Sequence, residues 1–180
     1  MTFACSAADS EHMIDLDSFD VAKAIIKLNC PSFNDFVSEL DPNIVLFDRF
    51  MIEEQFAWRV EQACPNALRL LDTEDLHCLR YARHDALKQE REMTHSDLLK
   101  SEMAKREVAA ILRCDLTLMI SLVEMKFLKD VFNIDDKLLI HLPFLLSKIN
   151  DNNRNWPSFD ERQHFLSIGN FRHAPNWDAV

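Results

Sequence analysis

Short apolar runs alternate along the chain with segments whose apolar residues recur at helical spacing. The runs have the length of strands, and several are bounded by Asp, Asn, Ser or Pro. Most are apolar at every position, which is typical of strands buried on both faces of a parallel sheet. The predicted strands cover residues 2–7, 22–28, 44–47, 67–71, 116–120 and 138–142.

The segments between these runs carry helix signals. Residues 50–63 place Ile52, Phe56 and Val60 on one stripe. Ser121 and Glu124 stand at the spacing of a capping box, which opens a helix. Repeated alternation of strand and helix predicts an α/β fold, with a parallel sheet and helices on both faces. The predicted helices cover residues 31–40, 50–63, 75–91 and 97–113, with a further one from residue 121.

One clear break in composition lies at residues 150–157, which read Asn-Asp-Asn-Asn-Arg-Asn-Trp-Pro. It predicts a linker over 150–163, after a first domain formed by 1–149. Residues 164–168 are expected to form a new strand and the following residues a turn, so that 164–180 would be an incomplete second domain. One strand and part of a helix cannot bury a core of their own.

Composition narrows the classes of function. Thirty acidic residues against 20 basic ones give a net charge of -10, and a surface that follows phosphates normally has the opposite sign. We therefore expect no nucleic-acid partner. The single glycine, Gly169, excludes a Gly-rich phosphate loop in residues 1–168.

Cysteine usage and hydropathy bear on location. The five cysteines stand singly among apolar neighbours with no C-x-x-C motif, so we expect reduced, mostly buried thiols and a cytoplasmic protein. The longest apolar runs fall far short of the ~20 residues of a membrane span, and no transmembrane segment is predicted. Peripheral contact of the protein with a membrane surface stays an open alternative.

The most concentrated polar segment runs from Leu70 to Arg80. A strand ending in Asp72 would deliver Asp75 and His77 to the carboxyl edge of the sheet, where open α/β folds bind ligands. In one interpretation Asp75 and His77 are catalytic and Asp72 and Arg80 bind substrate. Asp75 and His77 are then expected to be partly exposed, in the same concavity as Arg49 or Ser121. In the other, Asp72 or Thr73 caps a helix, and the basic residues form a solvated face.

Arg49 also follows a predicted strand at a carboxyl edge. Its planar guanidinium could bind a phosphate or carboxylate of a substrate, or it could pair with Asp48 or Glu53. Both interpretations stay open. No metal site is predicted, because the seven histidines show no H-x-x-x-H or H-E-x-x-H spacing. No G-x-S-x-G nucleophile elbow is present either.

Four motifs occur in order along the chain and together carry a resemblance. They are D-T-x-D-L-H-x-L-R at 72–80, D-L-T-L-M-I-S-x-x-E at 115–124, L-P-F at 142–144, and F-x-x-R followed by I-G-N-F-x-H-x-P-N-x-D-A-V over 159–180. From about Ile44 onward the chain resembles the "group 1" (family 4-like) glycosyltransferases of GT-B fold. The last motif is the most specific of the four.

The resemblance implies two Rossmann-like domains that face a cleft. The N-terminal domain receives the acceptor, and Asp72, Asp75, His77 and Arg80 would line its wall. The C-terminal domain holds a nucleotide-sugar donor, which is a substrate, and no separate cofactor is implied. Its first loop, near the donor diphosphate, would contain Gly169, Asn170, His173 and Asn176.

The chain departs from the family pattern at both ends. Family members begin with a strand that leads into a Gly-rich turn. This chain has Cys5-Ser-Ala-Ala8 instead, so we expect that first strand of the family pattern to be missing. The acidic motif that holds the donor would lie beyond Val180. The leading hypothesis is therefore a glycosyltransferase-like protein, inactive as these 180 residues alone. The alternative is a non-catalytic interaction module derived from one, and a different Rossmann-type enzyme is disfavoured because a Gly-rich loop is missing.

Overall fold

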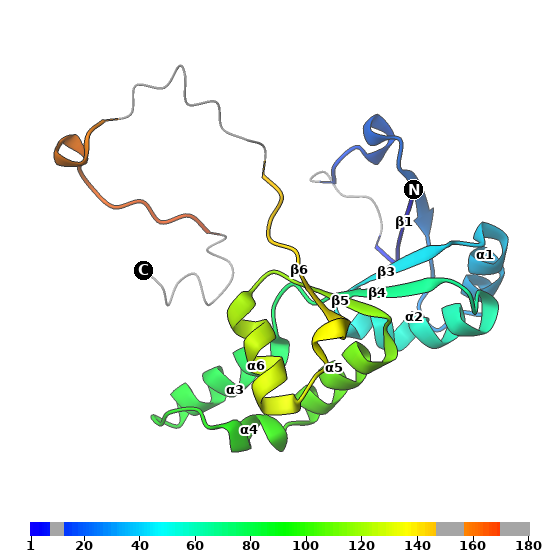
Figure 1. Ribbon diagram of the computed structural model, residues 1–180. Helices are drawn as coiled ribbons and strands as arrows, with labels where there is room; N and C mark the ends of the chain where they lie inside the picture. Colours follow the sequence, from blue (N-terminus) through cyan, green and yellow to red (C-terminus); the bar gives the residue numbers. More distant parts are fainter. Residues whose placement is uncertain (8–12, 147–156, 170–180) are drawn as a thin grey trace. The chain divides into compact units, whose positions relative to one another are not determined.

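The computed structural model describes residues 1–7, 13–146 and 157–169 (Figure 1). The chain divides into two units, Met1–Phe144 and Leu145–Val180. The first unit is α/β, with parallel sheets flanked by helices, and the fold class expected from the alternation of strands and helices is confirmed. Each predicted strand in this unit is present, with ends that differ by a few residues. The strands are β1 (Thr2–Cys5), β2 (Ala22–Ile25), β3 (Ile44–Asp48), β4 (Leu68–Asp72), β5 (Leu116–Met119) and β6 (Leu139–His141).

The helices follow the predicted segments with one division. Residues 97–113, expected as one helix, belong to two, because the first ends with Lys100 as its C-cap and the side chain of Ser101 caps the second. A capping box between Thr94 and Asp97 fixes the start of the shorter helix. The helices are α1 (Ser32–Leu40), α2 (Phe50–Ala63), α3 (His77–Lys88), α4 (His95–Leu99), α5 (Glu102–Arg113) and α6 (Leu122–Phe132), with short 3-10 turns at η1 (Leu16–Phe19) and η2 (Asp136–Leu138).

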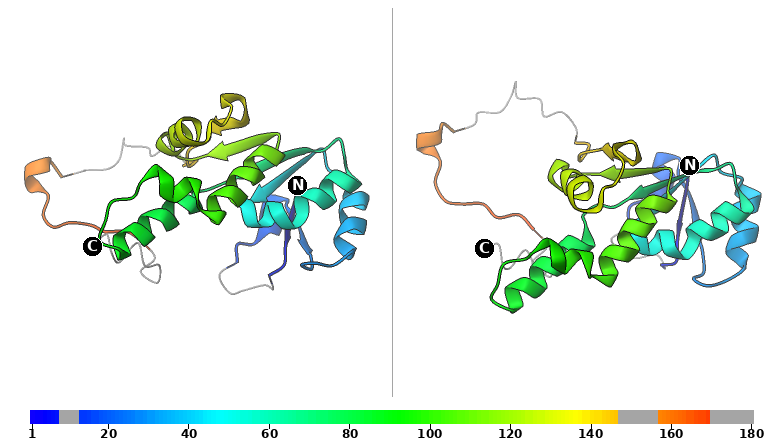
Figure 2. Two further views of the ribbon diagram at one scale, coloured as in Figure 1. Left: turned by 90° about the horizontal axis from the view of Figure 1, so that it is seen from below. Right: turned by 60° about the horizontal axis from the view of Figure 1, so that its bottom comes forward.

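Strands β3 to β6 form one parallel sheet in consecutive order, and β1 and β2 form a separate parallel pair. Consecutive strands added in one direction through right-handed crossovers carry their connecting helices on the same face. Figure 1 shows α2, α5 and α6 on one side of the four-stranded sheet, below the strands, and Figure 2 shows them from below.

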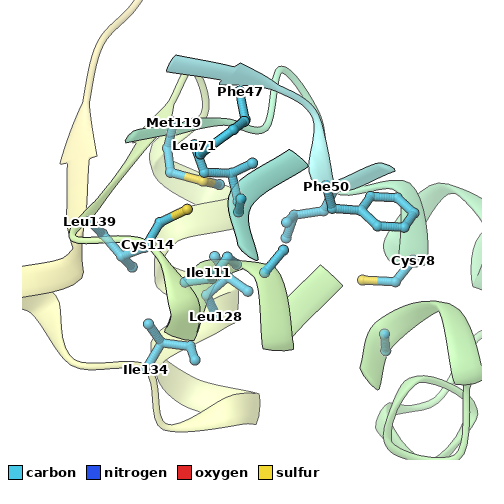
Figure 3. Close-up of a cluster of buried hydrophobic side chains, with 14 of the residues drawn as sticks. Phe47, Phe50, Leu71, Cys78, Ile111, Cys114, Met119, Leu128, Ile134 and Leu139 are labelled. Carbon is cyan, nitrogen blue, oxygen red and sulfur yellow. The ribbon is translucent and has the colours of Figure 1, made fainter. Parts of the chain in front are cut away.

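The core lies between this sheet and its helices. Phe47, Leu71, Thr117 and Leu139 are neighbours across the four strands, and all four are buried. Figure 3 shows the side chains of this face packed over the helices. Burial of this apolar surface supplies the main drive for folding. From the helices come Ile111 of α5 and Leu128 of α6, which are fully buried.

The opposite face of the sheet is also apolar but is exposed. Ile44 is 56% exposed, Leu46 53%, Leu68 51% and Ile140 44%. In the described residues the helices therefore cover one face of this sheet, although the sequence of the strands suits burial on both. We call this surface the open face; it consists of Ile44, Leu46, Asp48, Leu68, Leu70, Asp72, Leu116, Leu118 and Ile140.

The second unit is described over residues 145–146 and 157–169. Phe159–Glu161 is a 3-10 turn that a capping box of Ser158 and Glu161 begins. The strand expected at 164–168 is not formed in the described residues: it has no partner strand there, and His164 has a φ of 72°. No helix in the described parts of the chain is long and apolar enough to cross a membrane.

Candidate functional site

The carboxyl ends of β3 and β4 bring two of the predicted segments together. Asp48 and Asp72 are register partners and the last residues of these strands. Directly after β3, the backbone N–H of Arg49 donates to the Asp72 carbonyl at 2.8 Å. Arg49 and the turn that begins at Asp72 thus share one edge of the sheet, where the sequence placed them.

Both turns at this edge hold non-glycine residues in the left-handed region. Arg49 has φ 68° and ψ 156°, a backbone conformation that residues other than glycine rarely adopt, and Glu74 has φ 56°. Such conformations cost of the order of 1–3 kcal/mol each and persist where surrounding contacts enforce them. Here the contacts include the Arg49 bond to Asp72 and a bond from the Glu74 N–H to Asp72 Oδ1 at 3.2 Å. Strain gathered at one sheet edge is typical of functional sites.

Asp75 stands between two predicted site residues. Its Oδ1 lies 3.5 Å from Nε2 of His77, and its Oδ2 accepts from Nη1 of Arg80 at 2.7 Å. The Asp75 and Arg80 side chains are about two-fifths exposed, so solvent and ligands can reach them. The three residues therefore form one connected group with the Asp75 carboxylate at its centre.

His77 is buried, contrary to the expectation that it is partly exposed. It is 6% exposed, and its ring meets Phe50 edge to face at a centroid distance of 5.5 Å. The cause is the packing of the first turn of α3 against α2 and α5. Since Nε2 faces Asp75, a ligand would meet His77 through that carboxylate and not directly.

The start of α3 is capped by Glu107 of α5, a residue that the sequence analysis did not single out. Its carboxylate is 2% exposed and accepts the backbone N–H groups of His77 at 3.0 Å and Cys78 at 2.9 Å. The interpretation that Asp72 or Thr73 caps this helix is therefore wrong. In the described structure Thr73 Oγ1 instead donates to the Leu118 carbonyl at 3.1 Å.

Arg49 pairs with Asp48. Its Nε and Nη2 each donate to one Asp48 carboxylate oxygen at 2.9 Å, and these bonds raise the pKa of the guanidinium. The other predicted partner, Glu53, is fully buried and accepts from Nε of Arg113 at 2.8 Å. The guanidinium that was considered for a ligand phosphate is thus already engaged by a neighbouring carboxylate.

Charges at the edge favour hydroxyl groups over phosphate. Four carboxylates (Asp48, Asp72, Glu74 and Asp75) stand beside two guanidiniums, Arg49 and Arg80, and both guanidiniums bond to carboxylates. A carboxylate accepts hydrogen bonds from a sugar hydroxyl, whereas it repels a phosphate. In the described residues no group of three or more His, Cys, Asp or Glu side chains could hold a metal ion.

At the next edge position, Ser121 begins α6 as the sequence predicts. Its Oγ accepts from the Glu124 N–H at 3.3 Å. Burial raises the pKa of the Glu124 carboxyl, and its Oε2 has no hydrogen-bond partner among the described residues. Two cavities, of about 440 and 340 Å³, lie between α2 and α5 and beside α3 and α4, and neither is lined by Asp75, His77 or Ser121.

The predicted donor-side residues lie in the second unit. Gly169 is exposed, whereas Asn170, His173 and Asn176 fall outside the described residues. Comparisons of the chain with protein-family models, with curated proteins and with solved structures found no match.

Proposed function

We propose that this chain is a glycosyltransferase-like protein whose first unit binds a hydroxyl-bearing acceptor at the carboxyl edge of β3 and β4. The observation that supports this most is the Asp75 carboxylate, reachable from solvent and held between His77 and Arg80. The ordered motifs that resemble GT-B glycosyltransferases supply the reaction class. The parallel α/β fold is compatible with an acceptor site at this edge and with this reaction class.

In this proposal Asp75 accepts a hydrogen bond from the acceptor hydroxyl that becomes glycosylated, and a carboxylate so placed can take up the hydroxyl proton as a general base. Arg80 fixes the orientation of the Asp75 carboxylate through the bond to Oδ2, and His77 contacts Oδ1 from the buried side. Asp72 and the strained turn at Glu74 hold the backbone of this loop in place.

We further propose that these residues do not transfer a sugar alone. Stabilising a departing nucleoside diphosphate requires amides, arginines or lysines that are directed at it. Arg49 and Arg80 are already bonded to carboxylates, and the proposed donor loop at Gly169 belongs to the second unit. A donor nucleotide sugar should therefore bind weakly to the chain.

The test compares acceptor and donor ligands by NMR and calorimetry. Neutral mono- and disaccharides are expected to shift the backbone amide signals of residues 72–77, and Asp75→Asn should abolish these shifts. Asp85→Asn is the matched control, because Asp85 is an exposed aspartate of α3, outside the loop that contains Asp75. Shifts that gather elsewhere, or low-micromolar binding of uridine or guanosine diphosphate sugars, would overturn the assignment of this edge as the acceptor site.

A non-catalytic interaction module is the second candidate. The open face favours it, because exposed apolar surface of this kind marks interaction sites. Failure of every sugar to shift the signals of residues 72–77, together with partner binding at the open face, would favour this candidate over the first.

A further inference from the structure

The cavity of about 440 Å³ between α2 and α5 lies at the amino end of β4 and β5, the end of the sheet opposite to Asp72. Its volume falls within the range of about 300–1,000 Å³ that is usual for small-ligand pockets. We call it the Trp58 cavity. Its lining includes Glu53, Glu54, Trp58 and Glu61 of α2, Arg69 of β4 and Arg113 of α5.

The charges around the Trp58 cavity balance. Each of its three carboxylates is paired with a guanidinium: Glu53 with Arg113 at 2.8 Å, Glu54 with Arg106 at 2.6 Å, and Glu61 with Arg69 at 3.3 Å. An ionic ligand would meet both signs of charge, so attraction to one group is offset by repulsion from the other. A neutral ligand with several hydroxyl groups can donate to the carboxylates and accept from the guanidiniums. The wall therefore favours a neutral polyhydroxy ligand over a phosphate or an amine.

The indole of Trp58 adds a requirement for a ring. Trp58 is 51% exposed, which leaves a large aromatic surface for a ligand. The guanidinium carbon of Arg59 lies 4.6 Å from the centroid of this ring, and Arg59 in turn donates to Asn34 Oδ1 at 2.8 Å. These contacts hold the indole in place before a ligand arrives, which lowers the entropic cost of binding. One face of a sugar ring carries mainly C–H groups and can pack flat on an indole, whereas an open-chain polyol has no such face.

We propose that the Trp58 cavity binds a neutral sugar ring, with its C–H face on the indole of Trp58 and its hydroxyl groups bonded to Glu61 and Arg113. The buried Glu53 engages Nε and Nη2 of Arg113, so that Nη1 is the group offered to the sugar. The inference does not depend on glycosyl transfer, because no residue of the Trp58 cavity belongs to the group around Asp75.

The test is an NMR titration of the full chain with glucose, galactose, mannose and N-acetylglucosamine. At least one of these sugars should shift the backbone amide signals of residues 54–61 and the indole N–H signal of Trp58. Trp58→Ala should weaken this binding at least about tenfold, and Trp58→Phe, which keeps an aromatic face, by no more than about threefold. Phe19→Ala is the matched control, since Phe19 is an exposed aromatic residue of η1 and does not line the cavity; its affinity should equal that of the unchanged chain.

Charged derivatives test the class of ligand. The 6-phosphate and the 2-amino derivative of the sugar that binds should both bind more weakly than the neutral sugar, because each brings a charge to a balanced wall. Tighter binding of the phosphate would overturn the assignment in favour of an anion site. Tighter binding of the amine would overturn it in favour of a cation site.

The same titration separates this proposal from the acceptor site. Asp75→Asn should leave the shifts of residues 54–61 unchanged. Shifts at residues 72–77 alone would overturn the Trp58 cavity as a sugar site and leave the acceptor edge standing, and shifts at 54–61 alone would do the reverse. Absence of any shift at 54–61, or equal affinity of the Trp58→Ala and Phe19→Ala proteins, would also overturn the proposal. If Trp58→Ala loses its circular dichroism signal, Trp58→Leu, which keeps an apolar side chain without a flat face, makes the same comparison.

Discussion

Glu107 is the residue on which the start of α3 depends most. We predict that Glu107→Ala lowers the free energy of unfolding by about 2–4 kcal/mol, because the buried N–H groups of His77 and Cys78 lose a charged acceptor. Glu107→Gln keeps one acceptor oxygen and should lower the free energy of unfolding by less than Glu107→Ala does. Urea unfolding measures both, with Glu102→Ala, exposed on the same helix, as a control close to zero. Equal losses for Glu102→Ala and Glu107→Ala would contradict the capping role.

Glu124 should make stability depend on pH. Burial raises the pKa of its carboxyl in the folded state. Below the unfolded pKa of about 4.3 both states are protonated, and Glu124 has no effect. As the pH rises through the folded pKa, ionisation is harder in the folded state, so a penalty develops and stays at neutral pH. We therefore predict that Glu124→Gln increases the free energy of unfolding at pH 7 and leaves it unchanged at pH 4.

The measurement is urea unfolding of both proteins from pH 4 to pH 7. Glu102→Gln is the control, because Glu102 also lies in the first turn of a helix but is exposed. That change should not stabilise the protein at pH 7. A loss of stability in Glu124→Gln at neutral pH would show that the carboxylate is satisfied by contacts in solution.

At the level of elements, α2 and α5 are joined by two ion pairs that differ in burial. Glu53 is fully buried and paired with Arg113, whereas Glu54 and Arg106 are both partly exposed. Removing one partner of a buried pair leaves an uncompensated charge, which costs about 3–5 kcal/mol, while exposed pairs contribute about 0–1 kcal/mol. We predict that Arg113→Ala destabilises the protein by about 2–4 kcal/mol, since Arg113 itself is half exposed, and Arg106→Ala by about 1 kcal/mol.

Thermal and urea unfolding of the two variants give the comparison. The double variant Glu53→Met with Arg113→Leu should recover much of the loss, because it removes the buried charge together with its partner. Equal costs for Arg113→Ala and Arg106→Ala would mean that Glu53 reaches water in solution.

The elements themselves could be predicted because their signals are local. Apolar runs predict β3 to β6, and the pattern after Ser121 predicts α6. The carboxyl-edge position of Arg49 and Asp72 follows from the ends of their strands. The burial of His77 and the cap on α3 could not be predicted in this way, because they depend on Glu107, which lies on another helix and is brought close only by packing.

For the whole molecule, the order of the strands decides which face of the sheet the helices cover. The pattern of apolar residues along the chain does not decide this. The runs in β3 and β4 are apolar on both sides, and the sequence therefore predicts helices on both faces. The consecutive order β3-β4-β5-β6 carries its crossover helices on one face, so the described residues fill only that side. Strand order depends on pairing between distant segments, and no local pattern encodes it.

The two units should also differ in what they contribute to stability. In the part of the chain that the structure describes, the buried residues of the main hydrophobic cluster lie between Phe33 and Leu139. We predict that a chain of residues 1–146 unfolds cooperatively in urea, with a free energy of unfolding within about 0.5 kcal/mol of the full chain, because it keeps every described residue of this cluster. A chain of residues 1–137 is the contrasting variant: it loses β6 and the buried Leu139, and should be destabilised by more than about 2 kcal/mol. A loss above about 1 kcal/mol in the 1–146 chain would show that the second unit covers apolar surface of the first, and the open face would then be the place to look for that contact.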